Sequence, residues 1–169
     1  YLYLKFFMAI FGQSDLVLRL TSTFAGILSI IIMYFVGKEK DEKTGILCAG
    51  FSAISSFLIY YSQEVRFYSI LFLFSALSLL YILKSIQKPT KKNLILCTVF
   101  NFLILFTHTI GFVFVFFNLI FLSLNLYKQF KKLVITIWGS IIILSLITTP
   151  LAIKIMTTQS FSQWWGHFS

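Results

Sequence analysis

The longest uncharged run of the chain is residues 94–127, LILCTVFNFLILFTHTIGFVFVFFNLIFLSLNLY, in which 34 residues include no Asp, Glu, Lys or Arg. As one α-helix the run would be about 51 Å long at 1.5 Å per residue, whereas the hydrocarbon core of a bilayer is about 30 Å thick. Lysines flank both ends of the run, so both ends are expected on the same side of a membrane. The sequence therefore predicts two short antiparallel spans that turn near residues 107–111.

The rest of the chain has the same apolar character. Hydrophobic residues make up 59% of the sequence and charged residues 11%, against about 45–50% and about 25% in soluble globular proteins. This balance excludes a water-soluble domain, because a core of this size cannot bury so much apolar surface. We expect an all-α polytopic transmembrane bundle of about six spans, preceded by a short interfacial helix at residues 2–11. The other four spans are expected at residues 16–37, 44–61, 67–83 and 133–153.

Basic residues predict how the chain is oriented in the membrane. There are 14 Lys and Arg against five Asp and Glu, which gives a net charge of +9. Ten of the 14 lie in three loops, at residues 38–43, 84–92 and 128–132. The positive-inside rule makes these loops cytoplasmic, so the turns at residues 62–66 and near residue 108 face the extracytoplasmic side. Membrane orientation thus explains the excess of basic residues, so we expect no nucleic-acid partner.

Thiols and imidazoles do not form a metal-binding pattern in this sequence. Cys48 and Cys97 lie inside apolar runs, which favours buried reduced thiols over a disulfide or a metal pair. The two histidines, His108 and His167, lack the spacing of zinc ligands. We therefore expect neither a metal nor a cofactor.

Polar side chains gather at the predicted extracytoplasmic turn. Once the acids of the basic loops are set aside, the remaining carboxylates are Asp15 and Glu64. The guanidinium of Arg offers a planar fork that suits phosphate oxygens, and a carboxylate can accept a proton or orient a hydroxyl. In a helix, positions 64 and 68 would share a face, whereas positions 64 and 66 would point apart. Residues 64 and 66 would then contact different parts of one ligand, unless the turn is unwound. The candidate residues are Ser62, Gln63, Glu64, Arg66 and Tyr68.

A purely structural interpretation of the same residues is also open. Ser62 would then be an N-cap, Glu64 a first-turn acid, and Arg66 and Tyr68 interfacial anchors. His108, between two threonines, is either an interfacial residue or part of a binding pocket.

A similar choice concerns the start of the first span. Asp15 and Arg19 are four residues apart, which favours a local cap and ion pair there over a catalytic role.

Several segments, taken in order, resemble a known family. They are FGQSD at residues 11–15, followed by RL at 19–20 and FAG at 24–26, then YYSQEVRFY at residues 60–68, and THTIG at residues 107–111. This order is similar to that of GT-C glycosyltransferases of the dolichyl-phosphate-mannose-protein mannosyltransferase and aminoarabinose transferase type, and is closest to their bacterial and archaeal relatives. The resemblance covers nearly the whole chain, and its most specific part is the Ser-Gln-Glu-x-Arg-x-Tyr run at residues 62–68.

The resemblance implies a multi-pass cell-membrane enzyme of the cell envelope. Such an enzyme takes a sugar from a polyprenyl-phosphate donor and places it on an acceptor glycan, lipid or protein at the extracytoplasmic face. Residues 1–169 would be part of one transmembrane glycosyltransferase domain, truncated at the N-terminus, since the chain begins at Tyr1 without an initiator Met, and also at the C-terminus. The catalytic aspartate of the family would lie upstream of Tyr1, so this chain alone is expected to be inactive.

The resemblance also implies roles for the candidate residues. Glu64 would support catalysis beside the donor phosphate and sugar, and Arg66 would bind the phosphate. Tyr68 would support the pocket, with Ser62 and Gln63 beside it, and His108 would be a more distant pocket residue.

Two other classes of membrane protein remain open at this stage. A transporter or lipid flippase would line a path through the bilayer with polar residues. The predicted spans are poor in charge and the polar cluster lies at one face, which favours chemistry on a lipid-borne substrate. A non-catalytic membrane subunit is the third interpretation.

Overall fold

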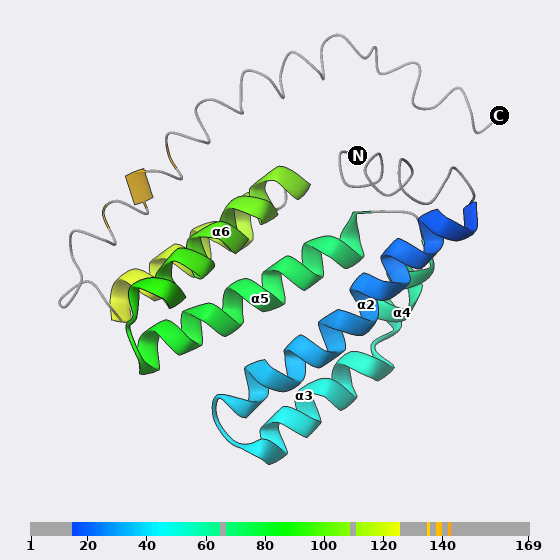
Figure 1. Cartoon of the computed structure of the whole chain (residues 1–169), viewed down its shortest axis with the longest axis horizontal. Coiled ribbons are helices and arrows are strands. Elements are labelled where there is room, and N and C mark those ends of the chain that lie inside the picture. Colours follow the sequence, from blue (N-terminus) through cyan, green and yellow to red (C-terminus); the bar gives the residue numbers. More distant parts are fainter. Residues whose placement is uncertain are drawn as a thin grey trace, which may run out of the picture. The chain divides into compact units, whose positions relative to one another are not determined.

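The computed structural model describes residues 15–64, 67–108 and 111–125, together with single positions at 135, 138, 139 and 142. The chain divides into two units, Tyr1–Asn125 and Leu126–Ser169, and the described helices belong to the first unit. The predicted all-α class is confirmed. The expected interfacial helix at residues 2–11 and the expected span at residues 133–153 lie outside the described ranges. The helices are α2 (Asp15–Lys38), α3 (Glu42–Ile54), α4 (Ser56–Gln63), α5 (Tyr68–Gln87), α6 (Lys91–Thr107) and an unlabelled helix, Gly111–Asn125 (Figure 1).

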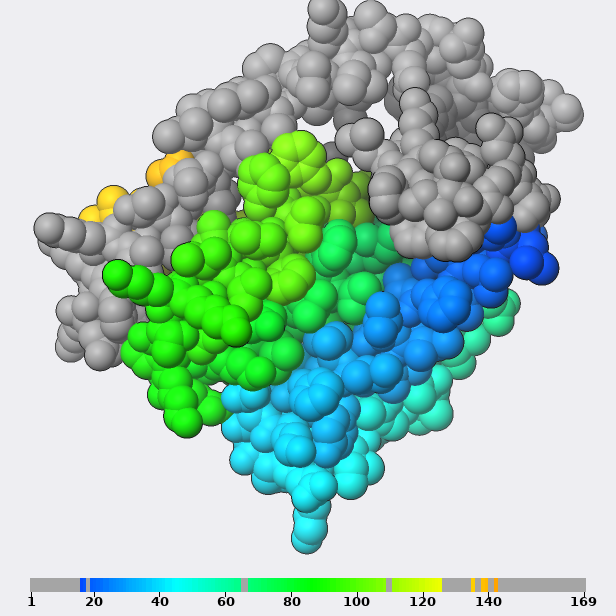
Figure 2. Space-filling view, in the orientation of Figure 1, coloured from blue at the N-terminus to red at the C-terminus, as the bar shows by residue number. Residues whose placement is uncertain are grey.

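Helix α2 contacts α3, α4 and α5, and α5 in turn contacts α6. Figure 2 shows α2, α5 and α6 side by side on one face of the described bundle. Glycines allow the α2–α3 hairpin to close tightly, since a Cβ on Gly37 would lie 2.6 Å from the carbonyl oxygen of Thr44. Asp41 caps the start of α3 by accepting a hydrogen bond of 2.7 Å from the Thr44 backbone N–H. That bond and a second one from the Thr44 hydroxyl lower the pKa of the Asp41 carboxyl.

Two of the described helices are long and apolar enough to cross a membrane, over Arg19–Lys38 and Tyr68–Gln87, 20 residues each. The predicted span at residues 44–61 is divided instead into α3 and α4, which meet at an angle of 55°. If this bent pair is one span, the described residues contain three candidate spans. The total of six spans therefore stays a prediction. Ser55 leaves the helix with ψ 112°, and the Ser52 hydroxyl bonds back to the Cys48 carbonyl, a contact that bends helices.

Within the 34-residue apolar run, the described residues form two helices on either side of the predicted turn. Neither is among the helices long enough to cross a membrane, so two spans here stay a prediction. Helix α6 ends at Thr107, His108 adopts an extended conformation, and the next helix begins at Gly111, whose N–H donates to the His108 carbonyl at 2.9 Å. A side chain at Gly111 would clash with α6, because a Cβ there would lie 2.6 Å from Cγ2 of Ile104. Glycine therefore permits the close return of the chain.

Buried amides tie the hairpin to α5. The Asn118 side-chain amide donates to Oγ of Ser78 and to Oδ1 of Asn101, both at 3.2 Å. Asn101 in turn donates to the Cys97 carbonyl at 3.0 Å. Polar groups without partners are costly in hydrocarbon, so these bonds favour one register of the three helices. By contrast, large apolar side chains such as Phe51 (69% exposed) and Leu124 (81% exposed) lie on the outside, as expected where lipid is the solvent.

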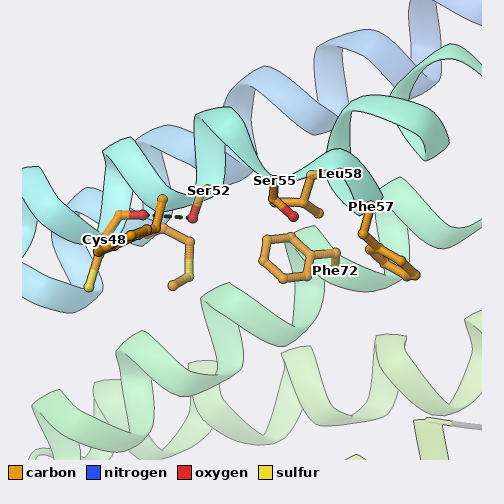
Figure 3. A pocket seen from close by; sticks show the side chains of 8 residues that line it. Cys48, Ser52, Ser55, Phe57, Leu58 and Phe72 are labelled. Atoms are coloured by element: carbon orange, nitrogen blue, oxygen red, sulfur yellow. Dashed lines mark hydrogen bonds between the residues drawn. The ribbon is translucent and has the colours of Figure 1, made fainter.

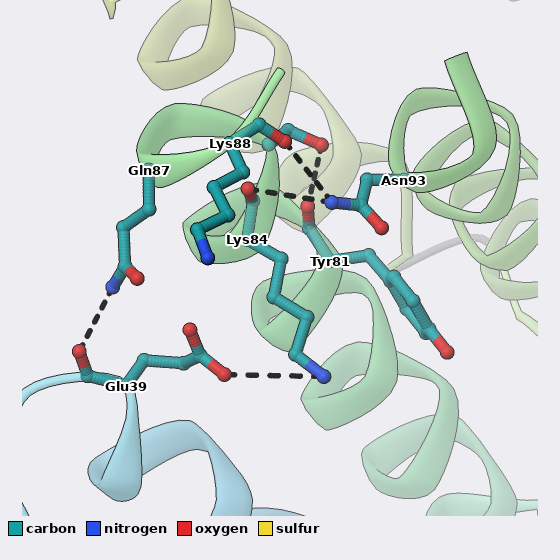
Figure 4. A network of polar contacts seen from close by, with 7 residues as sticks. Glu39, Tyr81, Lys84, Gln87, Lys88 and Asn93 are labelled. Atoms are coloured by element: carbon teal, nitrogen blue, oxygen red, sulfur yellow. Dashed lines mark hydrogen bonds and ion pairs between the residues drawn. The ribbon is translucent and has the colours of Figure 1, made fainter. Parts of the chain in front are cut away.

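Two of the lysine-rich loops lie at the same end of the bundle. The Gln87 amide donates to the Glu39 carbonyl at 2.8 Å, and Nζ of Lys84 lies 3.9 Å from Oε1 of Glu39 (Figure 4). The loops at residues 38–43 and 84–92 are therefore joined directly, in agreement with the charge count. The third loop, at residues 128–132, lies outside the described ranges.

Candidate functional site

The α4–α5 connection, at the other end of α5, carries the polar motif. Helix α4 ends at Gln63, Glu64 is extended with φ −89° and ψ 145°, and α5 begins at Tyr68 after its N-cap Phe67. The capping interpretation is wrong for two residues. Glu64 precedes the first turn of α5, and the Ser62 hydroxyl donates to the Ile59 carbonyl in the last turn of α4. Glu64 and Tyr68 consequently do not share a helical face. Glu64 lies in non-helical backbone, as expected if the turn is unwound at this residue.

Three contacts hold this connection in place. The Thr23 hydroxyl on α2 donates to the Ser62 carbonyl at 3.1 Å, and the Ser69 hydroxyl on α5 donates to the Tyr61 carbonyl at 2.7 Å. A Cβ on Gly26 would lie 2.9 Å from Cβ of Ser62, so the end of α4 packs directly against the backbone of α2. Glu64 is thus presented by a turn whose two sides are anchored.

His108 reaches the same turn from the α6 hairpin. Its ring stacks on Phe67 with a centroid separation of 4.1 Å and an interplanar angle of 12°, and lies 6.4 Å from the Tyr68 ring. Burial lowers the pKa of His108 below its usual value of 6.5, which favours the neutral imidazole near pH 7. The structure therefore brings His108 together with the α4–α5 motif, although about 40 residues separate them in the sequence.

A run of aromatic rings leads from α4 into the turn. The Phe57 and Tyr61 ring centroids are 4.5 Å apart, those of Tyr61 and Tyr68 4.3 Å, and those of Phe67 and Tyr68 4.2 Å. Edge and tilted contacts at these separations are favourable and hold the rings in fixed orientations. The ring of Tyr68 is therefore positioned by its neighbours on both sides.

Sequence reasoning found the motif but missed part of its support. No role was predicted for Thr23, Gly26 or Phe67, although Gly26 and Phe67 lie in segments that carry the family resemblance. A hydroxyl and a glycine three residues apart on α2 indicate a surface for close helix contact.

Several predicted residues fall outside what the structure describes. Arg66 lies outside the described ranges, and so does the side chain of Asp15, so the phosphate contact and the Asp15–Arg19 pair stay predictions. Within the described part of the chain, no group of three or more His, Cys, Asp or Glu is placed to hold a metal ion.

The described residues form an apolar helical bundle of the membrane-protein class, with an anchored polar turn at one end. Residues 1–153 match the family model described as dolichyl-phosphate-mannose-protein mannosyltransferase, and the chain belongs to this family. It is therefore a membrane glycosyltransferase of the GT-C type, which confirms the resemblance seen in the sequence. Comparisons with curated proteins and with solved structures give no match.

Proposed function

We propose that the full-length protein moves a sugar from a polyprenyl-phosphate donor to an acceptor glycan, lipid or protein at the extracytoplasmic face of a multi-pass membrane domain. One observation carries this proposal: the end of the bundle opposite the joined lysine loops gathers Ser62, Gln63, Glu64, Tyr68 and His108. The positive-inside rule assigns that end to the extracytoplasmic side. Family membership supports the glycosyltransferase chemistry, and the polar end is where we expect the phosphate-linked sugar to bind.

The reaction is a displacement at the anomeric carbon of the donor sugar. The acceptor oxygen forms the new glycosidic bond as its proton passes to a base, and the bond from the anomeric carbon to the phosphate oxygen breaks. Polyprenyl phosphate leaves with the bonding electrons. Phosphate is a competent leaving group, so positive charge at its oxygens matters more than proton donation to them.

Each motif residue has a proposed part in this step. Arg66 binds the phosphate through its planar fork. Glu64 plays a supporting role by accepting hydrogen bonds from the sugar beside the phosphate, and the family resemblance assigns acceptor deprotonation to an aspartate. Tyr68, Gln63 and Ser62 line the donor site, and His108 supports it as a neutral ring stacked on Phe67.

The buried amides of the described helices form a packing network and do not indicate a transport path. Ser78, Asn101 and Asn118 are each at most 8% exposed, and the Asn118 amide donates to both of the others. Such a closed network is explained by helix packing, so we do not retain the transporter or flippase alternative as a proposal.

Sugar transfer by the full-length protein tests the proposal. Membranes containing it are supplied with a radiolabelled sugar on polyprenyl phosphate or on a nucleotide, and label reaching the acceptor fraction is counted. We expect transfer from the lipid donor only, and a loss of about 10²–10³-fold in Glu64→Gln, comparable to removing one preorganised polar group. Glu39→Gln, which changes a carboxylate at the opposite end, is the matched control and should keep its activity. Equal rates in both variants would contradict the assigned site.

A further inference from the structure

A groove of about 330 Å³ lies beside the break between α3 and α4. Four helices line it, from Met33 on α2 to Phe72 on α5, and Figure 3 shows the Phe72 ring facing Ser55 and Leu58 at the break. The 55° bend between α3 and α4 therefore leaves a hollow where a straight helix would continue. The volume is at the lower end of about 300–1,000 Å³ typical of ligand pockets, which suits a segment of a long molecule.

The chemistry of the groove selects an apolar occupant. Its wall is mostly aromatic and aliphatic, and the Ser52 hydroxyl already bonds the Cys48 carbonyl at 2.7 Å. The rings of Phe51 and Phe57 are 69% and 56% exposed, so the mouth of the groove opens where lipid surrounds the helices. A charged or strongly hydrated ligand would gain few polar contacts there, whereas a hydrocarbon chain would be well matched.

Contacting aromatic rings along α4 link the groove to the candidate donor site. Phe57 lines the groove, its ring contacts Tyr61 at 4.5 Å, and Tyr61 contacts Tyr68 at 4.3 Å. Helix α4 connects the two places with eight residues, which is about 12 Å at 1.5 Å per residue. A lipid whose phosphate lies at the Glu64 turn can therefore lay the first part of its chain along α4 into the groove.

We propose that the groove at the α3–α4 break binds the phosphate-proximal part of the donor's prenyl chain. This inference rests on the proposed function, because the phosphate must first be held at the α4–α5 turn. Bulk phospholipid chains can contact any exposed apolar face of the bundle. A chain tethered at the turn has a high effective concentration in the groove, and this tethering favours the prenyl chain over an acyl chain.

Photolabelling of the full-length protein tests the location. The protein is reconstituted in vesicles of phosphatidylethanolamine and phosphatidylglycerol with a polyprenyl phosphate that carries a diazirine near its phosphate end. We expect label on peptides containing Cys48, Leu58 or Phe72, and we expect unlabelled polyprenyl phosphate to compete it away. A phosphatidylcholine with a diazirine in its acyl chain is the comparison. If it labels these peptides equally and prenyl phosphate does not compete, the groove is an ordinary lipid contact and the inference is wrong.

Filling the groove gives a second readout. Cys48→Trp places a large ring in it, and Leu47→Trp changes the preceding residue, which is 59% exposed and does not line the groove. For Cys48→Trp we expect the KM for the long-chain donor to rise about tenfold, which corresponds to the lost burial of about two methylene groups. The KM for a donor whose chain is too short to reach the groove should not change, and Leu47→Trp should behave like the unmodified protein.

The outcomes separate the two proposals. Equal kinetics for Cys48→Trp and Leu47→Trp, with transfer from both donors intact, overturns the groove and leaves the proposed function standing. Absence of transfer from both the long-chain and the short-chain prenyl donor overturns the proposed function itself.

Discussion

Glu64 occupies an extended position between two helices, and this changes what a carboxylate at that place can do. On a helix, residues two positions apart point to different sides, which would separate Glu64 from the arginine at position 66. The backbone of Glu64 is outside both α4 and α5, so this helical restriction does not apply to it. The anchors from Thr23 and Ser69 hold the turn on both sides, which is the preorganisation that an electrostatic role requires.

Arg66 provides the first prediction at the residue scale. In the full-length enzyme, Arg66→Ala should lower the rate of sugar transfer by about 10²–10³-fold, because a preorganised contact with the leaving phosphate is lost. Arg66→Lys should restore little of this rate, since a point charge does not reproduce the planar fork. Lys88→Ala, at the opposite end, controls for the change in net charge. The assay is transfer of labelled sugar at saturating acceptor, and near-normal rates for Arg66→Ala would favour an interfacial anchor.

His108 provides a prediction about pH. Its pKa in the folded protein lies below the usual value of 6.5, so the unfolded chain binds the proton more readily. The stability contributed by the neutral ring is therefore fully present above pH 6.5 and is lost as the pH falls through that value towards the folded pKa. Thermal unfolding of the protein should show a midpoint that decreases between about pH 7 and about pH 5. His108→Phe keeps a ring against Phe67 without the proton, so its midpoint should fall less over this interval.

At the scale of helices, some features were predictable from the sequence and others were not. The turn within residues 94–127 followed from two features: 34 uncharged residues exceed one bilayer crossing, and lysines flank both ends of the run. The break at Ser55 was not predicted, because no proline or charged residue marks it. It arises from the extended conformation of Ser55, together with the hydrogen bond from the Ser52 hydroxyl to the Cys48 carbonyl. The polar motif could be predicted, because its polar residues form a short run between two apolar segments. The Phe67–His108 stack was not, because it joins segments that only the tertiary fold brings together.

Gly111 allows a test of the hairpin at this scale. Gly111→Ala should lower the free energy of unfolding by about 1–3 kcal/mol, the usual cost of overpacking. The added Cβ would lie 2.6 Å from Cγ2 and 2.8 Å from the carbonyl oxygen of Ile104, and a backbone carbonyl cannot move aside cheaply. Gly50→Ala is the matched control, because a Cβ there meets nothing within 4 Å. It should leave stability unchanged or raise it by up to about 1 kcal/mol. Equal unfolding midpoints for both variants in detergent would refute tight packing at the turn.

The whole described bundle is polarised along its helices. Helix α5 spans 20 residues, about 30 Å, which matches the thickness of the bilayer hydrocarbon. At one end Glu39 joins two lysine-rich loops through Gln87 and Lys84, and at the other end the turn around Glu64 meets His108. One membrane thickness therefore separates the basic loops from the candidate donor site, and the orientation of the bundle decides which compartment each end faces.

Cysteine labelling of the full-length protein in intact cells tests that orientation. Single cysteines are introduced at Lys88 and Gln63, both of which have exposed side chains. With a membrane-impermeant thiol reagent we expect labelling at Gln63 and resistance at Lys88, because the lysine-rich loops are predicted to be cytoplasmic. Both sites should react after the cells are permeabilised, which shows that each thiol is accessible. The native Cys97 is buried among the helices and should stay unlabelled throughout. Labelling at Lys88 but not at Gln63 in intact cells would invert the topology and place the candidate donor site in the cytoplasm.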